Sequence, residues 1–212
     1  MDIPVVPVRI VRNEIISSDI IFSGGSAAMG DNTVRYADLI SSDDTNNKNA
    51  PVLIIDVKGM QRKDIMPDIL KRVRSKRELW FMTGVRDAGD LIDAFQSDMS
   101  KVAVPYHFTS DRLLKDMIEI SDCCIPALFA DRNGVHMKGK RNDLRNVVRS
   151  LENMNFRRVL VFDVSGGGWD GINDLCDTVV PFVAPGEDRD AVHDLGFRDV
   201  MFQAVGPSSN KA

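Results

Sequence analysis

The chain has 212 residues, of which 43% are hydrophobic and 27% are charged, a balance typical of a soluble globular protein with a sizeable core. Its 27 Lys and Arg residues against 31 Asp and Glu residues give a formal net charge of -4, which excludes the broad basic surface expected of a nucleic-acid-binding protein. Three cysteines are too few for a disulfide framework and favour a cytoplasmic location, and no apolar run is long enough for a membrane span.

Short β-branched runs alternate with amphipathic stretches along the chain, which predicts βα units around a parallel sheet. We expect strands at residues 5–10, 52–56, 79–82, 101–104, 124–129, 158–163, 178–183 and 199–204. Eight is the strand number of a (β/α)8 TIM-type barrel, so the pattern predicts a single barrel domain over residues 1–212.

The stretches between these strands have the apolar spacing or the composition of helices, and we expect helices at residues 63–76, 87–96, 110–120, 141–154, 171–176 and 189–195. Two places break the alternation. Residues 23–50 are mostly Gly, Ser, Asn and Asp, with only a brief candidate helix near 34–40, and the chain ends soon after Ala204. The first and eighth helices of the barrel wall are therefore predicted to be reduced or missing.

An internal repeat divides the chain into half-barrels of about 1–108 and 109–212. Residues 52–59 (VLIIDVKG) match residues 159–166 (VLVFDVSG) at a constant offset, and each segment is an apolar strand that ends in Asp. A weaker echo relates residues 12–15 (RNEI) to residues 132–135 (RNGV). The alternative is that any parallel barrel repeats buried apolar strands followed by Asp or Gly.

A duplicated half-barrel with Asp closing its second and sixth strands resembles the isomerase and cyclase of histidine biosynthesis, the HisA/HisF family. The resemblance extends over most of the chain and is greatest in residues 79–95, which include the run FMTGVR, and in residues 195–201 (LGFRDVM). It implies a barrel of two similar halves.

In that family an Asp at the end of strand one and another at the end of strand five are the acid and base of an Amadori aldose-ketose rearrangement. The matching positions here are near Ile10 and Phe129, and neither side chain can transfer a proton. A small alignment slip would bring Asp131 into the second role. The resemblance therefore implies a divergent relative that does not catalyse the ancestral reaction.

The family also binds two substrate phosphates on Gly-rich loops at the carboxyl ends of its strands. The corresponding candidates here are Gly84 after strand three, and Gly206 and Ser208 after strand eight. Gly166 and Gly167, after strand six, are further candidates for binding an anion, although their pattern favours a flexible strand-to-helix turn. We expect a small phosphorylated ligand on at most one such site.

Asp56 and Asp163 end equivalent strands, and Lys58 lies two residues beyond the first of them. Paired carboxylates at a barrel mouth could act as acid and base, or each could cap a turn. No spacing of His and Cys residues indicates a metal site, and no fingerprint indicates a cofactor.

Two classes of function therefore remain open. One is an isomerase or lyase that acts on a different phosphorylated metabolite. The other is a non-catalytic relative that senses a ligand or serves in an assembly. Loss of the neighbouring first and eighth helices would expose an apolar strip of sheet, from which we predict a homodimer.

Overall fold

The structure is a computed structural model that describes residues 1–23, 26–40, 50–137, 140–163 and 169–204. The eight predicted strands form a closed barrel in which every neighbouring pair is parallel, including the closing pair of first and last strands. In order around the barrel they are β1 (Asp2–Val11), β6 (Val52–Asp56), β7 (Leu79–Met82), β8 (Lys101–Pro105), β9 (Cys124–Asp131), β12 (Val159–Asp163), β13 (Val179–Val183) and β14 (Val200–Gln203). The predicted α/β barrel is thereby confirmed.

The barrel strands bury both of their faces, and this explains their continuous apolar runs. In β6, Leu53 and Ile55 pack in the hydrophobic cluster that fills the barrel. Val52 and Ile54 face the other way and pack in the cluster beneath the helices. Successive side chains of a strand point to opposite faces, so this assignment also fixes which strand-end residues face the barrel interior.

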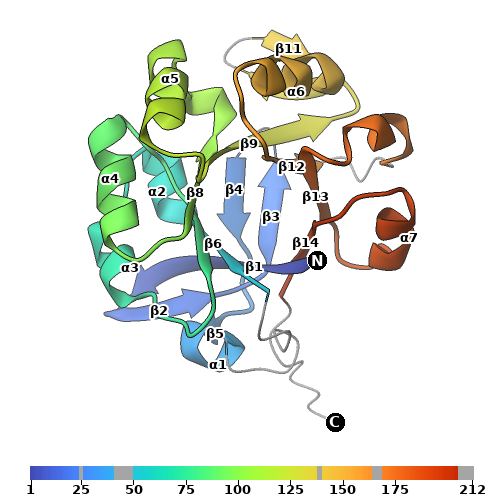
Figure 1. Ribbon diagram of the computed structural model, residues 1–212. Helices are drawn as coiled ribbons and strands as arrows, with labels where there is room; N and C mark the ends of the chain where they lie inside the picture. The colour runs from blue at the N-terminus through green and yellow to red at the C-terminus, as the bar shows by residue number, and fades with distance from the viewer. Residues whose placement is uncertain (24–25, 41–49, 138–139, 164–168, 205–212) are drawn as a thin grey trace.

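The helices lie around the outside of the strands (Figure 1). They are α2 (Val57–Arg62), α3 (Pro67–Arg72), α4 (Ala88–Gln96), the 3-10 helix η2 (Tyr106–Phe108), α5 (Asp111–Ile120), α6 (Leu144–Asn153), the 3-10 helix η3 (Asp170–Leu175) and α7 (Arg189–Asp194).

The prediction of one helix over 63–76 is wrong in its bounds, because only α3 lies within these residues and α2 ends at Arg62, before them. Lys63 ends α2 in the left-handed conformation, with φ 56°. Met66 is extended, as residues before proline prefer to be, and Pro67 occupies the first turn of α3.

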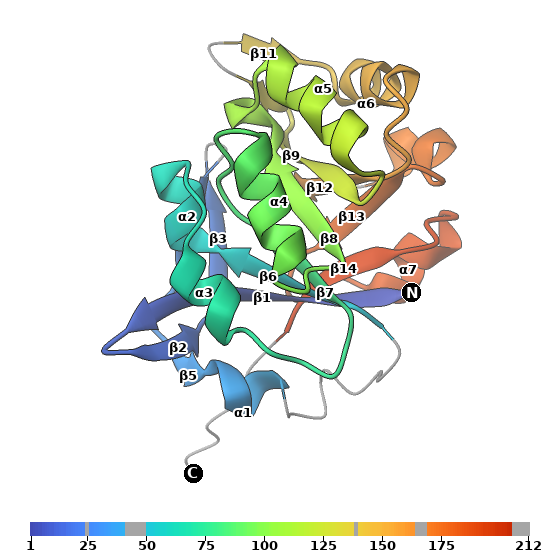
Figure 2. The ribbon, with the colours of Figure 1, turned by 60° about the vertical axis from the view of Figure 1, so that its left-hand side comes forward.

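Two hairpins extend the barrel sheet at equivalent places in the two halves. β1 turns into β2 (Glu14–Ser17) through Arg12 and Asn13, both with positive φ, and β2 pairs with β5 (Val34–Arg35). β9 turns into β10 (Gly134–Met137), which pairs with β11 (Lys140–Asn142). Figures 1 and 2 place the two extensions on opposite sides of the barrel. The sequence echo at residues 12–15 and 132–135 thus corresponds to two hairpin turns.

The second hairpin also corrects the predicted helix over 141–154. Arg141 belongs to β11, and α6 begins only at Leu144, after the Asp143 side chain has accepted a hydrogen bond from the Asn146 N–H. An Asp at this position is a favoured helix cap, since it satisfies a backbone donor that has no partner within the helix.

The polar stretch between the first two barrel strands holds another hairpin, β3 (Ile20–Ser23) with β4 (Ser26–Met29), which forms a separate two-stranded sheet. The candidate helix at 34–40 is confirmed only from Tyr36 onward, as α1 (Tyr36–Ile40). Within the described residues, these five are the helical part of the first connection. The prediction about the eighth helix falls on residues 205–212, which lie outside the described residues.

The outer surface of β1 and β14 bears on the predicted homodimer. Pro4, Val6 and Val200 are buried there, and Phe202 is half-buried beneath the Arg189 guanidinium, which lies 4.3 Å from the ring centre. At these positions the apolar strip that motivated the dimer is covered. The homodimer itself remains a prediction.

The amino end of the barrel is closed by Trp80, which is 1% exposed. Lys101 and Arg158 lie over its ring at 5.6 and 5.5 Å, and its indole N–H donates to Glu78.

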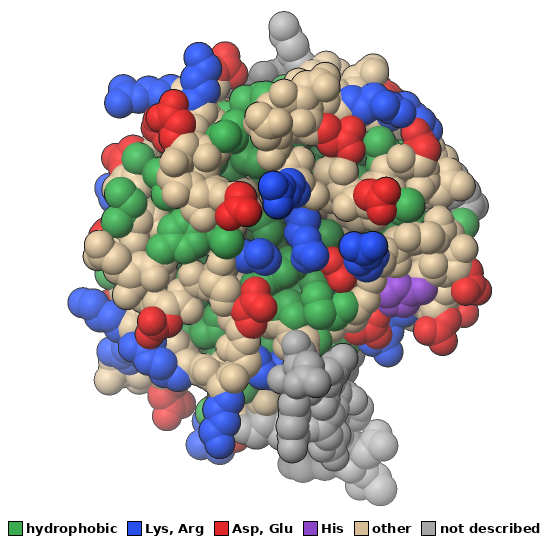
Figure 3. All heavy atoms as spheres, in the orientation of Figure 1, with side chains coloured by type: hydrophobic (Ala, Val, Ile, Leu, Met, Phe, Trp, Pro, Cys, Tyr) green, Lys and Arg blue, Asp and Glu red, His purple; other side chains and the backbone are tan. Residues whose placement is uncertain are grey.

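On the face drawn in Figure 3, Lys and Arg side chains near the middle lie beside carboxylates, so the surface there carries no continuous patch of positive charge. Arg158 also pairs with Asp199 at 3.0 Å.

Candidate functional site

The carboxyl end of the barrel, where α/β barrels keep their active sites, is filled by an aromatic cluster. Phe22 of the β3–β4 hairpin lies 5.6, 4.8 and 5.3 Å from the ring centres of Phe129, Phe162 and Phe182. All three barrel residues belong to the interior cluster and lie at or near the ends of β9, β12 and β13. Phe22 therefore occupies the middle of the mouth.

Few polar contacts attach this hairpin to the barrel among the described residues. The Gln61 side-chain amide donates to the Ala27 carbonyl at 3.1 Å, and that of Gln203 donates to the Asp19 carboxylate at 2.9 Å. On the opposite face of the hairpin Ile21 is 55% exposed. The hairpin thus docks mainly through the apolar side chains of one face.

The two positions that match the family's catalytic Asp residues lie in different environments. Phe129 is fully buried in the barrel interior. Ile10 packs against the outer cluster, so it faces away from the mouth. The barrel-facing position beside it is Arg9, whose Nε is buried and has no hydrogen-bond partner among the described residues.

Asp56 is fully buried and points away from the barrel interior, into the layer between the sheet and the helices. Its carboxylate accepts a hydrogen bond from the Gly59 N–H at 2.8 Å, which caps α2, and another from the Thr83 hydroxyl at 3.1 Å. Burial raises its pKa to about 6, although these two hydrogen bonds act to lower it. The geometry gives Asp56 the structural role of a helix cap.

Two glycines make room for this arrangement. A Cβ on Gly59 would lie 2.1 Å from the Asp56 carboxylate, and a Cβ on Gly84 would lie 2.4 Å from the Gly59 carbonyl and 2.5 Å from the Asp64 nitrogen. Gly84, predicted as a phosphate-binding residue, is thus required for close contact between the loop after β7 and the end of α2. This contact explains why a glycine stands at position 84, and no bound ligand is needed to explain it.

The other predicted site residues that the structure describes, Lys58 and Asp131, belong to different elements and have no contact with each other. Lys58 is exposed on α2. Asp131 accepts from the Asn133 N–H at 2.8 Å in the β9–β10 turn and pairs with Arg141 at 2.6 Å and His136 at 3.2 Å. The hydrogen bond from Arg141 lowers the pKa of Asp131. Asp163 ends β12, but its side chain lies outside the described part of the structure, as do Gly166, Gly167, Gly206 and Ser208.

His107, in η2 directly after β8, was not singled out as a site residue by sequence reasoning. Its ring lies perpendicular to that of Phe129, with 5.3 Å between the ring centres, and both ring nitrogens are buried without a partner among the described residues. Burial lowers its pKa to about 4, assisted by the nearby charges of His136 and Lys63. The imidazole is therefore neutral at physiological pH.

A cleft of about 260 Å³ lies where β13 and β14 end, which is where (β/α)8 barrels commonly bind phosphate. It is lined by Arg189, Gln203, Phe202 and the loop from Val183 to Glu187. The Ala184 N–H donates to the Glu187 carboxylate at 2.9 Å, so an anionic group of the chain itself already binds this loop. Gly186 has positive φ (91°), and a Cβ on it would have no neighbour within 4 Å.

Glu187 was not among the predicted site residues. The pairing of its side chain with the strand-end amide could not be read from the pattern, because it depends on the turn at Gly186.

No protein-family model matches this chain, and no curated protein matches it either. Among the described helices, none has the length and apolar character needed to cross a membrane. The described residues also contain no group of three or more His, Cys, Asp or Glu side chains placed to hold a metal ion.

Proposed function

We propose that this chain is a non-catalytic relative of the HisA/HisF isomerases that binds a small phosphorylated molecule in the cleft where β13 and β14 end. The observation that carries the proposal is the hydrogen bond from the Ala184 N–H to the Glu187 carboxylate. A backbone donor at this strand end already binds an anionic oxygen, and a phosphate oxygen would take the same place once Glu187 turns aside.

Positive charge near the cleft supports a phosphorylated ligand. Arg189 contributes a guanidinium to the lining, where it also pairs with Asp2 at 3.0 Å, and the Gln203 side chain contributes the amide that donates to Asp19. A guanidinium donates to phosphate with good geometry, so Arg189 favours an anionic ligand over a neutral one.

The ancestral rearrangement is not part of the proposal. Proton transfer requires a titratable group within hydrogen-bond reach of the substrate. Phe22 fills the middle of the mouth, Asp56 is buried away from it, and Asp131 is held by Arg141 and His136. An isomerase or lyase of other specificity is the alternative, and turnover of a sugar phosphate would support it.

The test is a titration of the protein with inorganic phosphate and with ribose 5-phosphate, followed by calorimetry and by backbone amide NMR. Glu187→Gln removes a negative charge that competes for the Ala184 N–H and is expected to tighten binding several-fold. Arg189→Gln removes a charged donor and is expected to weaken binding about tenfold.

Arg35→Gln serves as the control, since Arg35 is exposed and pairs with Asp38 near α1. Its affinity for both probes should equal that of the wild type. The proposal fails if neither probe perturbs the Ala184 and Gly186 amides of the Glu187→Gln protein.

A further inference from the structure

A second cleft, of about 420 Å³, lies at the opposite end of the barrel from the proposed phosphate site. Two loops form it. The loop between α5 and β9 contributes Ser121, Asp122 and Cys124, and the loop between α6 and β12 contributes Asn155, Phe156 and Arg157, with Ile118 and Glu152 from the ends of the two helices. Its volume is within the range of small-molecule sites, about 300–1,000 Å³.

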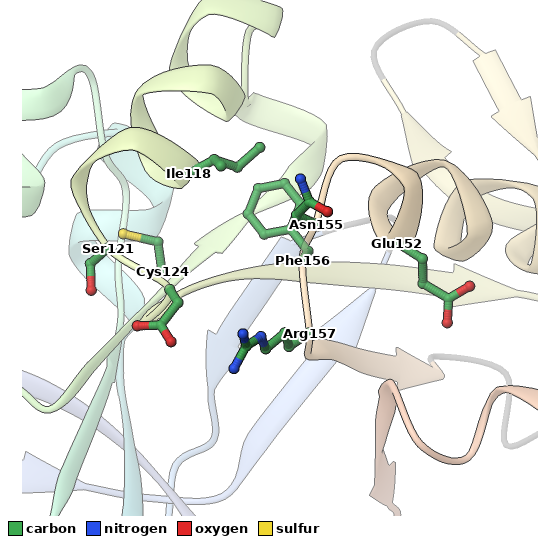
Figure 4. A pocket seen from close by; sticks show the side chains of 8 residues that line it. Ile118, Ser121, Cys124, Glu152, Asn155, Phe156 and Arg157 are labelled. Carbon is green, nitrogen blue, oxygen red and sulfur yellow. The ribbon is translucent and has the colours of Figure 1, made fainter.

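The floor of the cleft is apolar. Phe156 is 6% exposed and Cys124 is 3% exposed. Figure 4 shows the Phe156 ring in the middle of the lining residues, with Ile118 to one side and Arg157 below it. A ligand that enters this cleft therefore reaches a small apolar area on the floor and charged groups at the edges.

The charges of the cleft are two carboxylates and one guanidinium. Arg157 is exposed, and neither it nor Asp122 has an ion-pair partner among the described residues. Glu152 is positioned by the Thr178 hydroxyl, which donates to its carboxylate at 2.5 Å, and this bond leaves its negative charge unneutralised. Asp122 lies in the loop between α5 and β9 and Glu152 at the end of α6, so the two negative charges come from different parts of the lining.

We propose that this cleft binds a basic α-amino acid of the lysine class. Such a ligand carries one carboxylate for Arg157 and two ammonium groups for Asp122 and Glu152, joined by an aliphatic chain that would lie on Phe156. Its net charge of one positive unit balances the net negative charge of the three side chains. Each charged group of the cleft then gains an ion-pair partner, in addition to the hydrogen bonds that the Thr178 hydroxyl donates to Glu152 and the Cys123 thiol donates to Asp122.

The proposal is tested with L-lysine, norleucine and cadaverine. Norleucine has the same chain without the side-chain ammonium, and cadaverine lacks the carboxylate. L-lysine is expected to bind about tenfold more tightly than either analogue, with NMR shifts at the Ser121 and Asn155 amides, because each analogue leaves one charged group of the cleft without its partner.

Two variants test which side chain of the cleft binds which charged group of lysine. Arg157→Gln should make lysine and cadaverine bind equally. Glu152→Gln keeps an acceptor for Thr178 and should make lysine and norleucine bind equally. Arg149→Gln is the matched control, because Arg149 is exposed on α6 and pairs with Asp174 outside the cleft. Thermal unfolding of each variant verifies that it is folded.

Equal affinity of the wild type for lysine and cadaverine would overturn the proposal, as would the absence of saturable lysine binding at about 10 mM. The result is independent of the phosphate titration, since the two clefts lie at opposite ends of the barrel.

Discussion

His107 illustrates how a single buried side chain sets a pH dependence. Its pKa falls from 6.5 to about 4 because burial opposes protonation. The folded state thus holds the imidazole neutral while the unfolded chain protonates it. The stability that depends on the neutral form is complete above about pH 6.5 and is lost as the pH falls toward 4.

We expect His107→Leu to be more stable than the wild type, because leucine leaves no buried nitrogen without a partner. The gain should be about 1 kcal/mol near pH 7.5 and larger near pH 5, where the wild type alone loses stability on protonation. Urea unfolding at the two pH values measures the difference. An equal gain at both would show that the imidazole of the folded protein titrates normally.

Substitutions of Asp56 test whether this residue acts as a helix cap. Asp56→Asn retains an acceptor for the Gly59 N–H and should cost less than about 1 kcal/mol, whereas Asp56→Ala removes the α2 cap and leaves Thr83 without its acceptor, at a cost of about 2–4 kcal/mol. Because the pKa of Asp56 is raised to about 6, the wild type should also lose stability relative to Asp56→Asn as the pH rises from about 4 to 6. Chemical unfolding of the three proteins tests both expectations.

At the level of elements, the contact between α2 and the loop after β7 depends on Gly84. Gly84→Ala would force a Cβ against the backbone of Gly59 and Asp64, which we expect to cost about 2–3 kcal/mol of folding free energy. Gly171→Ala is the control, since a Cβ there has no neighbour within 4 Å. A fully stable Gly84→Ala protein would mean that the contact is looser than described and would reopen the phosphate-binding prediction.

The β3–β4 hairpin is expected to open separately from the barrel, because no strand pairing among the described residues joins the two sheets. Phe22→Ala removes the ring that contacts Phe129, Phe162 and Phe182 and should accelerate amide exchange within the hairpin more than within β9 or β12. Ile21→Ala, on the exposed face, should leave exchange close to the wild-type rate. Equal acceleration in hairpin and barrel strands would show that the two unfold together.

At the scale of the whole molecule, the barrel could be predicted because its strands are apolar on both faces. Such continuous apolar runs can be recognised in the sequence even when the neighbouring strands are unknown. The short strands of the hairpins carry no such signal, and β5 has only two residues. Pro67 was the local feature that contradicted the single helix over 63–76. These failures lie in the connections, where chain reversals depend on a few backbone angles.

The candidate site was less predictable for a related reason. Residues 52–55 are all apolar, so no alternation in the sequence reveals on which face of β6 Asp56 lies. The end of strand β6 was predicted correctly from the sequence. The direction of the Asp56 carboxylate, which faces the helices, becomes visible only in the register of the barrel strands. Phe22 was equally hidden, since it contacts residues more than 100 positions away in the chain.

The predicted homodimer also belongs to this scale. Light scattering at micromolar concentration tests it directly, and a mass of about twice the 23.6 kDa of one chain is the expected result. A monomer would agree with the burial of the outer residues of β1 and β14.

The two hairpin extensions have a consequence for aggregation. A closed barrel leaves no strand edge free, yet the twelve-stranded sheet ends at β11 and, through β2, at β5. Both end strands are very short, and the side chains of Arg35 and Arg141 on them are 68% and 39% exposed. Short, charged edges are poor templates for pairing with another chain. A longer, apolar β5 or β11 would give this barrel the intermolecular pairing surface that its closure otherwise removes.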